Sequence, residues 1–394
     1  MQNNEKVYQI PYGTRDYLPA EAAEKRLIET TLADYFSSWG YDEIVTPTIE
    51  YVDTLLMGNG QVLEPHMFKF FDKENRTVAL RHEMTTPIAR VVASRMDDEV
   101  LPLKLSYVSS VFRYEQAQTG RQCEFNQAGV EFMGAGSAMA DSEVVALAVK
   151  SLERAGLRDF QVCLGQVDFV NGIMEQFSLS DDVQAQIKTA LEKHDLVGLE
   201  KITDSLAISA EDKDVLKKIP LLHGDKSVID EAYKVVKNEK SRQALDNLVE
   251  ICKLLDIYGI TGHVQIDLDV IRDFNYYTGM VFEVYTPGLG CPICGGGRYD
   301  NMLKDFGTTC PATGFAIGIE RIMLALEQQG LSQANIVKDC YVAYAEGKAG
   351  EAIQKAETLR KSGKLTAVAP MTQTEQEAAA YQQKKGYKEL VYLK

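Results

Sequence analysis

Hydrophobic and polar residues alternate along two neighbouring segments of the chain, 105–115 and 124–133. An alternation with a period of two is typical of β-strands that bury one face. The residues between them, 116–122, are mostly polar and contain a glycine, which is typical of a turn. The pattern therefore predicts a β-hairpin.

The predicted hairpin carries an unusual number of polar and aromatic side chains. Side chains two or four positions apart share one face of a strand, so Arg113 and Glu115 point together, as do Gln127 and Glu131. A guanidinium group can hold a phosphate or carboxylate through two hydrogen bonds, and an aromatic ring such as Phe125 can stack on a base. The pattern favours a site for a small charged ligand. An ordinary half-exposed sheet with surface ion pairs is the alternative.

Other segments show helical or strand periodicity. Apolar residues at helical spacing predict a helix at 20–39, and charged helical periodicity dominates from about 176 to 260. The last 60 residues alternate between strand and helix patterns as β-α-β-α-β, which predicts a small parallel sheet with crossover helices. Further strands are predicted at 41–47, 77–80, 264–269 and 281–285, and further helices at 183–194, 232–255 and 320–329.

Length and composition indicate a cytoplasmic protein of more than one domain. At about 150 residues per domain, 394 residues correspond to two or three domains. The sequence has no run of 18 apolar residues and no basic and then apolar leader, so it predicts neither a membrane span nor secretion. Seven cysteines, an odd number, predict reduced thiols. Cys291 and Cys294 have no second pair at metal spacing, so no metal site is expected.

The net charge of -15 bears on nucleic-acid binding. Affinity for nucleic acid comes largely from the neutralisation of phosphates by basic side chains. The chain has 42 Lys and Arg against 57 Asp and Glu, and no stretch rich in basic residues with interleaved aromatics. Its composition therefore argues against tRNA binding.

Four matches, in order along the chain, resemble signatures of the histidyl branch of class II aminoacyl-tRNA synthetases. The segment 11–16 is similar to the start of that branch. The hairpin at 112–131, with Phe-Arg-x-Glu, Gly-Arg, Glu-Phe-x-Gln and Gly-x-Glu, resembles the second class II motif. The segments 272–279 and 294–300 together count as one match, to the two histidine-binding signatures, and 314–321 resembles the third class II motif. Four ordered matches are more specific than one glycine-rich string.

The resemblance implies an α+β fold with a class II synthetase-like antiparallel sheet flanked by helices. Residues 1–330 are expected to form this histidine-binding domain, with the helical insertion at about 176–260. Residues 335–394 resemble the start of an anticodon-binding domain, so a small truncated α/β C-terminal domain is expected. The segments 20–39 and 41–47 resemble the first class II motif, which implies a homodimer.

The resemblance also implies a set of site residues. Glu83 and Thr85 would bind the amino group of histidine, and Arg113 its carboxylate or a nearby phosphate. The expected histidine-binding residues are Glu83, Thr85, Arg113, Gln127, Glu131, Arg272, Tyr276, Tyr277 and Tyr299. A vestigial ATP or phosphate site would comprise Glu115, Arg121, Phe125 and Arg321. No residue is expected to be catalytic. Each of the three tyrosines, taken alone, is more often a core aromatic than a ligand-binding residue.

Three departures from the synthetase pattern resemble the regulatory subunit of ATP phosphoribosyltransferase, a paralogue of the synthetase. Met84 stands between Glu83 and Thr85 where the synthetase has glycine, and Gln116 replaces an arginine of the hairpin loop. Asp273 places a carboxylate beside Arg272, which disfavours the binding of anions there. The truncated C-terminal domain points the same way.

This resemblance implies a regulatory protein without catalytic activity or cofactor. It would join a short-form catalytic phosphoribosyltransferase subunit, as a homodimer within a larger hetero-oligomer, and mediate feedback by histidine in histidine biosynthesis. Two enzymatic alternatives use the same pocket. One is a histidyl-tRNA synthetase, and the other is an enzyme that adenylates an amino acid and loads it onto a carrier other than tRNA.

Overall fold

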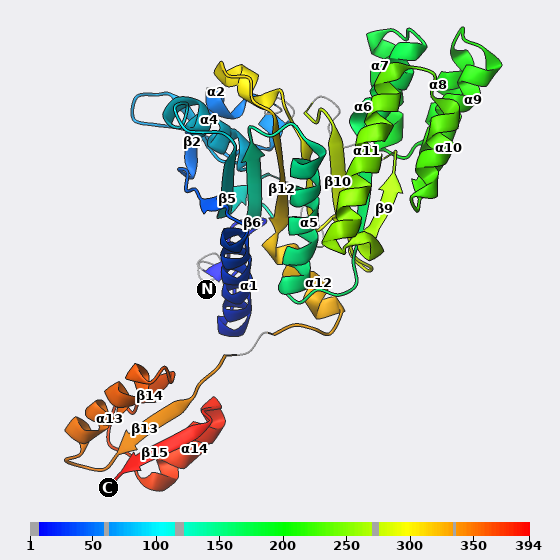
Figure 1. Ribbon diagram of the computed structural model, residues 1–394. Helices are drawn as coiled ribbons and strands as arrows, with labels where there is room; N and C mark the ends of the chain where they lie inside the picture. The colour runs from blue at the N-terminus through cyan, green and yellow to red at the C-terminus, as the bar shows by residue number, and fades with distance from the viewer. Residues whose placement is uncertain (1–7, 59–62, 115–121, 270–275, 334–335) are drawn as a thin grey trace, which may run out of the picture. The chain divides into compact units, whose positions relative to one another are not determined.

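The computed structural model describes residues 8–58, 63–114, 122–269, 276–333 and 336–394 (Figure 1). The chain divides into two compact units, one that includes Lys25–Ser332 and one that includes Gln333–Lys394. No helix in the described ranges is both long enough and apolar enough to cross a membrane.

A nine-stranded sheet forms the centre of the first unit. Its order is β1 (Asp42–Glu43), β5 (Leu103–Phe112), β6 (Glu124–Met133), β12 (Ala312–Gly318), β11 (Cys294–Arg298), β10 (Met280–Tyr285), β7 (Gln161–Gln166), β9 (Val264–Asp267) and β8 (His223–Gly224). Neighbouring strands are antiparallel except for β1 with β5 and β7 with β9. The expected antiparallel class II-like sheet is confirmed, with these two parallel pairs added.

The predicted hairpin is confirmed as β5 and β6, which pair along their whole length from Leu103 with Met133 to Phe112 with Glu124. The strand predicted at 41–47 is wrong in extent, because β1 has only two residues. After β1 the Ile44 amide still donates to the carbonyl oxygen of Ser106 at 2.9 Å, and the carbonyl oxygen of Thr46 accepts from the guanidinium of Arg81 at 2.8 Å.

Glycines 295–297 lie inside strand β11. Strand β11 pairs with β10 on one side and β12 on the other. A Cβ atom on Gly296 would lie 2.3 Å from the carbonyl oxygen of Gly314. These glycines therefore allow close approach between protein segments.

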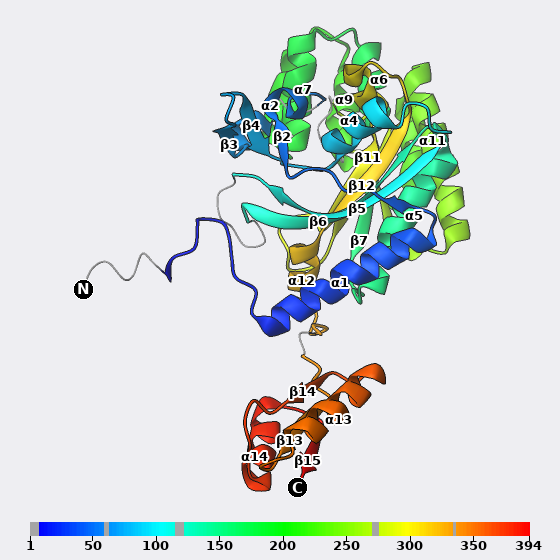
Figure 2. The same ribbon diagram turned by 90° about the vertical axis from the view of Figure 1, so that its left-hand side faces the viewer.

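Helices cover both faces of the sheet (Figures 1 and 2). The larger core lies on one face, where apolar residues four apart on α1, such as Ile28, Leu32 and Phe36, are buried. The helices of this face are α1 (Pro19–Ser38), α5 (Ala138–Arg154), α6 (Val167–Gln176), α11 (Glu239–Tyr258) and α12 (Ile319–Gln328). A smaller core on the other face includes α4 (Thr85–Arg95) and the 3-10 helix η5 (Met302–Phe306).

A separate three-stranded antiparallel sheet has the order β2 (Ile49–Tyr51), β4 (Thr77–Leu80) and β3 (Lys69–Phe71). Strand β4 was predicted with these bounds. The short helix α2 (Val52–Leu55) follows β2, and η2 (Glu64–His66) precedes β3.

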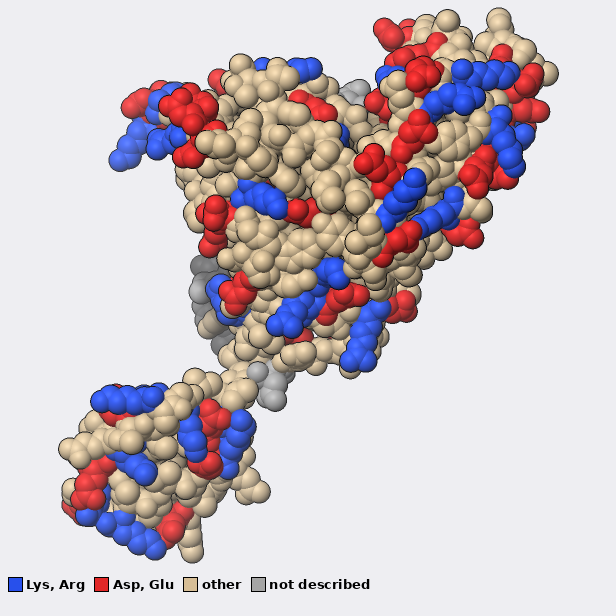
Figure 3. All heavy atoms as spheres, viewed as in Figure 1, with Lys and Arg blue, Asp and Glu red and all other residues tan. Residues whose placement is uncertain are grey.

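The helical insertion is confirmed. It contains α7 (Asp181–Glu192), α8 (Leu196–Ser205), α9 (Ala210–Lys218), η3 (Ile219–Leu221) and α10 (Ser227–Val235), and η4 (Thr261–His263) follows α11. The single helix predicted at 232–255 is wrong, because α10 ends at Val235 and α11 begins at Glu239. The Asn238 side chain accepts from the Ser241 amide at 2.7 Å, which caps a new helix, α11. Charges of both signs mix over these helices on the face in Figure 3.

The second unit has the predicted β-α-β-α-β order: β13 (Cys340–Tyr344), α13 (Ala349–Lys361), β14 (Thr366–Val368), α14 (Glu375–Lys385) and β15 (Glu389–Leu393). Its sheet is parallel, with β13 between β14 and β15. Two small cores form around it. One contains Ala378 of α14, and the other contains Ala352 and Ala356 of α13.

Candidate functional site

The buried carboxyl group of Glu131 on β6 is the centre of the site. Only 2% of the residue is exposed. The Thr85 hydroxyl donates to Oε1 at 2.8 Å, and the Tyr299 hydroxyl donates to Oε2. Burial raises the pKa of Glu131 to about 8, although both hydrogen bonds lower it. Near neutral pH this carboxyl group therefore carries a proton and can both donate and accept.

A glycine on the neighbouring strand makes room for this carboxyl group. Gly314 of β12 lies directly across from Glu131. A Cβ atom on Gly314 would lie 2.4 Å from both Glu131 Oε2 and the carbonyl oxygen of Val130. Any larger residue there would displace the carboxyl group or the strand.

Three tyrosines form an aromatic wall beside Glu131. The rings of Tyr276 and Tyr299 stack with centroids 5.4 Å apart and planes 14° apart. Tyr277 meets Tyr276 edge-on at 4.8 Å. Burial raises the pKa values of the Tyr276 and Tyr299 hydroxyls well above their usual range, so both remain protonated. The wall offers ring faces and hydroxyl groups to a planar polar ligand.

Glu83 and Thr85 lie where β4 turns into helix α4. The carboxylate of Glu83 accepts from the amides of Thr85 at 2.5 Å and Thr86 at 2.9 Å. Glu83 thus holds the first turn of α4, where a negative charge is favourable. The Thr85 hydroxyl points to Glu131 instead. The sequence did not indicate the helix start.

Arg113 lies close to Phe125 at the end of the hairpin. Its Nε donates to the carbonyl oxygen of His82 at 2.8 Å, and its guanidinium carbon lies 5.5 Å from the Phe125 ring centroid. One face of the Phe125 ring is therefore covered by the guanidinium group.

The remaining expected residues are less closely associated. Gln127 shares strand β6 with Glu131, and its Oε1 is buried without a hydrogen-bond partner among the described residues. Arg321 on α12 donates to the carbonyl oxygen of Pro292 at 2.5 Å. Glu115, Arg121 and Arg272 lie outside the described residues.

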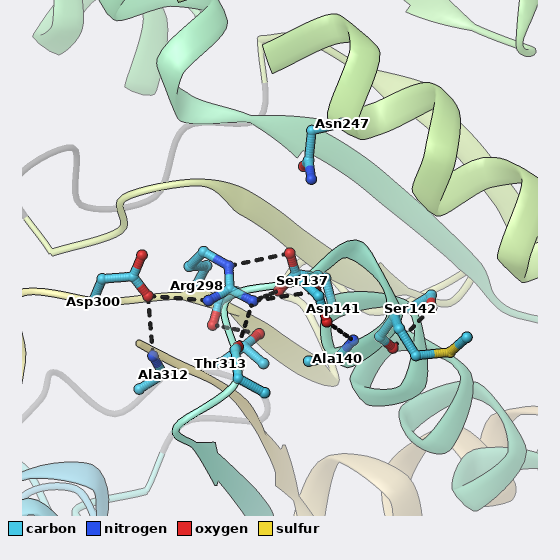
Figure 4. A network of polar contacts seen from close by, with 12 residues as sticks. Ser137, Ala140, Asp141, Ser142, Asn247, Arg298, Asp300, Ala312 and Thr313 are labelled. Atoms are coloured by element: carbon cyan, nitrogen blue, oxygen red, sulfur yellow. Dashed lines mark hydrogen bonds and ion pairs between the residues drawn. The ribbon is translucent and has the colours of Figure 1, made fainter. Parts of the chain in front are cut away.

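Sequence reasoning missed three buried residues around the site. Tyr107 of β5 lies across from Gly129, whose Cβ would stand 2.4 Å from the Tyr107 hydroxyl. Its inward position on an alternating strand was the available signal. Arg298 and Asp141 form a buried ion pair next to Tyr299 (Figure 4). They are far apart in sequence, and no local pattern connects them.

Nothing in the described part of the chain groups three or more His, Cys, Asp or Glu side chains as metal ligands. Cys291 and Cys294, considered above as half of a metal site, are both buried free thiols.

Comparison with known proteins places this geometry in a family. The family described as histidyl-tRNA synthetase matches residues 13–322. A protein of Moorella thermoacetica named ATP phosphoribosyltransferase regulatory subunit is 43% identical over 372 residues, which cover 94% of this chain and 95% of that protein. This chain belongs to the ATP phosphoribosyltransferase regulatory subunit family.

Solved structures share the fold of this family. A crystal structure from Bacillus halodurans, described as an ATP phosphoribosyltransferase regulatory subunit/histidyl-tRNA synthetase, matches with a TM-score of 0.88 and 34% identity over 98% of this chain and 99% of that one. Histidyl-tRNA synthetase from Nostoc matches with a TM-score of 0.82 and 20% identity over 96% and 90%. The regulatory-subunit family and the synthetase thus have one fold.

Proposed function

We propose that this chain is the regulatory subunit of ATP phosphoribosyltransferase, acts in the first step of histidine biosynthesis and senses histidine as a feedback effector. The observation that carries the proposal is the Glu131 carboxyl group beside the stacked rings of Tyr276 and Tyr299. An imidazole ring matches it, because the ring can stack and can both donate and accept hydrogen bonds. The names of relatives that span nearly the whole chain support the proposal.

The proposed contacts involve three groups of histidine: the imidazole ring, the ammonium group and the carboxylate. Glu131, Tyr276, Tyr277 and Tyr299 surround the imidazole, and Glu83 with Thr85 receives the ammonium group. Arg113 binds the carboxylate, and Gln127 and Arg272 complete the site. A site that hydrogen-bonds the ring nitrogens rejects apolar amino acids, because they leave buried polar groups without partners. Such selectivity suits a feedback sensor.

We propose that the chain has no adenylation activity. Two arginines that would meet ATP phosphates in a synthetase already bind carbonyl oxygens of the protein, Arg113 that of His82 and Arg321 that of Pro292. The guanidinium of Arg113 also covers one face of Phe125, where a base would stack. The acidic composition argues against tRNA binding.

The partner in this proposal is a short-form catalytic phosphoribosyltransferase subunit in the cytoplasm. Histidine acts by coupling, since its binding here shifts the partner between conformations, and the partner's ligands must change histidine affinity by the same factor. We also propose a homodimer within the complex. The support for a homodimer is an exposed apolar face of the sheet formed by β2, β4 and β3. On this sheet Tyr51 and Phe70 lie on either side of Val78 and are 42% and 40% exposed.

The decisive experiment measures the catalytic subunit with and without this chain, across a histidine titration. We expect activity to depend on this chain and to fall with histidine. The Glu131→Gln variant serves as the control, because it should support activity but lose sensitivity to histidine. Unchanged activity and sensitivity on addition of the wild-type chain would contradict the proposal.

A second measurement separates the proposal from the enzymatic alternatives. Calorimetric titration with histidine is paired with histidine-dependent ATP–pyrophosphate exchange. Binding without exchange supports a sensor. Robust exchange would instead identify a histidyl-tRNA synthetase or an enzyme that loads another carrier.

A further inference from the structure

Arg298, at the end of strand β11, is the centre of the polar network in Figure 4. Its Nε lies 3.1 Å from Asp141 Oδ2, and its Nη2 lies 2.8 Å from Asp141 Oδ1. The two residues are 7% and 1% exposed. A bidentate pair of this kind fixes the orientation of both groups, because the guanidinium is planar.

The same guanidinium also reaches a second carboxylate. Its Nη1 lies 3.1 Å from Asp300 Oδ1, and that oxygen also accepts from the Ala312 amide at 3.0 Å. The amide of Asp300 donates to the Thr278 hydroxyl at 2.9 Å. Asp300 thus connects the end of β11 to the start of β12 and to the segment before β10.

Both tyrosine-bearing segments of the site are attached to this network. Thr278 directly follows the Tyr276–Tyr277 pair, and its amide donates to the carbonyl oxygen of Arg298 at 2.7 Å. Tyr299 directly follows Arg298, and its amide donates to the carbonyl oxygen of Ala312 at 2.8 Å. The stack of Tyr276 on Tyr299 therefore joins two segments that residues 298–300 hold together.

The surrounding backbone leaves space for the guanidinium stem. A Cβ atom on Gly279 would lie 2.9 Å from Arg298 Cδ. Other contacts of Arg298 are the carbonyl oxygens of Ala135 and Ser137, at 3.2 and 3.5 Å. The side chain is thus tied to the loop before helix α5 and to Asp141 in its first turn.

We propose that Arg298 is a positioning residue for histidine binding. Held by Asp141 and bridged to Asp300, it sets the spacing of the Tyr276 and Tyr299 rings and the direction of the Tyr299 hydroxyl toward Glu131. The inference rests on the proposed histidine site. A pair that only stabilised the fold could be replaced by apolar side chains of similar size without loss of affinity.

The test uses the full chain with both members of the Arg298–Asp141 ion pair replaced by apolar residues, Arg298→Met and Asp141→Leu. We expect a Tm close to that of the wild type, a Kd for histidine at least tenfold higher, and faster hydrogen exchange at the amides of Thr278, Tyr299 and Asp300. The matched control, Lys104→Met with Glu143→Gln, removes another ion pair of α5, whose atoms lie 2.7 Å apart. The control should bind histidine as the wild type does.

A second variant keeps the test decisive if the double variant does not fold. Asp300→Ala removes the bridge and leaves the bidentate pair with Asp141 intact, so this variant should fold. Its affinity for histidine should nevertheless be at least fivefold lower than that of the wild type. Affinity within twofold of the wild type, with unchanged exchange at the three amides, would overturn the inference. Absence of histidine binding by the wild type would instead overturn the proposed function, and the exchange measurement would still test the positioning role.

Discussion

Glu131 and Asp141 are two buried carboxyl groups of one unit, and their partners differ. They are 2% and 1% exposed, so both are removed from water to the same degree. Asp141 faces the guanidinium of Arg298. Glu131 receives hydrogen bonds from two hydroxyl groups and feels the negative charge of Glu83.

The difference shows that one buried carboxyl group stabilises the structural framework, while the other belongs to the proposed ligand site. Burial raises the pKa of Asp141, and the charge and hydrogen bonds of Arg298 offset part of that effect. Burial raises the pKa of Glu131 to about 8, and no cation among the described residues is one of its causes. The carboxyl group that meets no cation within the described residues is the one suited to a ligand with an ionisable ring.

Loss of the Arg298 side chain should have the largest effect. Arg298→Met leaves Asp141 buried without its cation, which costs about 3–5 kcal/mol. Urea unfolding at neutral pH measures the change in the free energy of unfolding. A loss below 1 kcal/mol would show that the pair contributes no more than a surface pair does.

The stability of the wild type should depend on pH through Glu131. The folded-state pKa is about 8, against roughly 4.3 in the unfolded chain, so the folded state binds the extra proton between these values. The stabilisation is therefore present below about pH 4.3 and is lost as pH rises through 8, by roughly 2–4 kcal/mol. Urea unfolding of wild type and Glu131→Gln from pH 5 to 9 measures it as their difference. A difference that grows in favour of the wild type at higher pH would contradict this assignment.

The same Glu131→Gln substitution should weaken histidine binding at pH 7. The amide preserves size and can still donate a hydrogen bond, but it cannot ionise or transfer a proton to the imidazole. We expect the Kd to rise tenfold to a hundredfold, about 1.4–2.8 kcal/mol. Calorimetric titration gives the Kd, and Glu143→Gln on α5 is the control. An unchanged Kd would remove Glu131 from the ligand site.

Two glycine substitutions, one beside Glu131 and one beside Arg298, should have the smallest effects and should distinguish the ligand site from the structural framework. Gly314→Ala places a Cβ 2.4 Å from a backbone oxygen of Val130 and from Glu131 Oε2, so we expect a loss of about 1–3 kcal/mol together with weaker histidine binding. Gly279→Ala meets only side-chain atoms of Arg298, the nearest at 2.9 Å, and no backbone oxygen, so it should cost less. Thermal unfolding and calorimetry rank the two. A larger loss for Gly279→Ala would reverse the comparison.

The fold was largely predictable because its signals are local. Alternation gave the β5–β6 hairpin, and the β-α-β-α-β order of the second unit followed from periodicity. The errors occurred at the ends of elements. Strand β1 has only two residues, and farther along the chain the carbonyl oxygen of Thr46 binds the guanidinium of Arg81. Asn238 caps a new helix inside a continuous periodic pattern.

The site was predictable only in part. The motifs pointed to Glu131, Tyr276 and Tyr299, which the structure brings together. They gave no sign of the partner of Arg298, because Asp141 precedes it by 157 positions. They also could not show that Glu83 holds the start of α4 through two amides.

The sequence by itself determined which segments become strands and helices, which family the motifs resemble, and which residue types are available for a histidine site. Those properties depend on neighbouring residues and on spacing along the chain. Tertiary structure alone decided which carboxyl group meets a cation and which keeps a proton. That decision depends on burial and on distances of a few ångströms between strands and helices, and both exist only once the nine-stranded sheet has assembled.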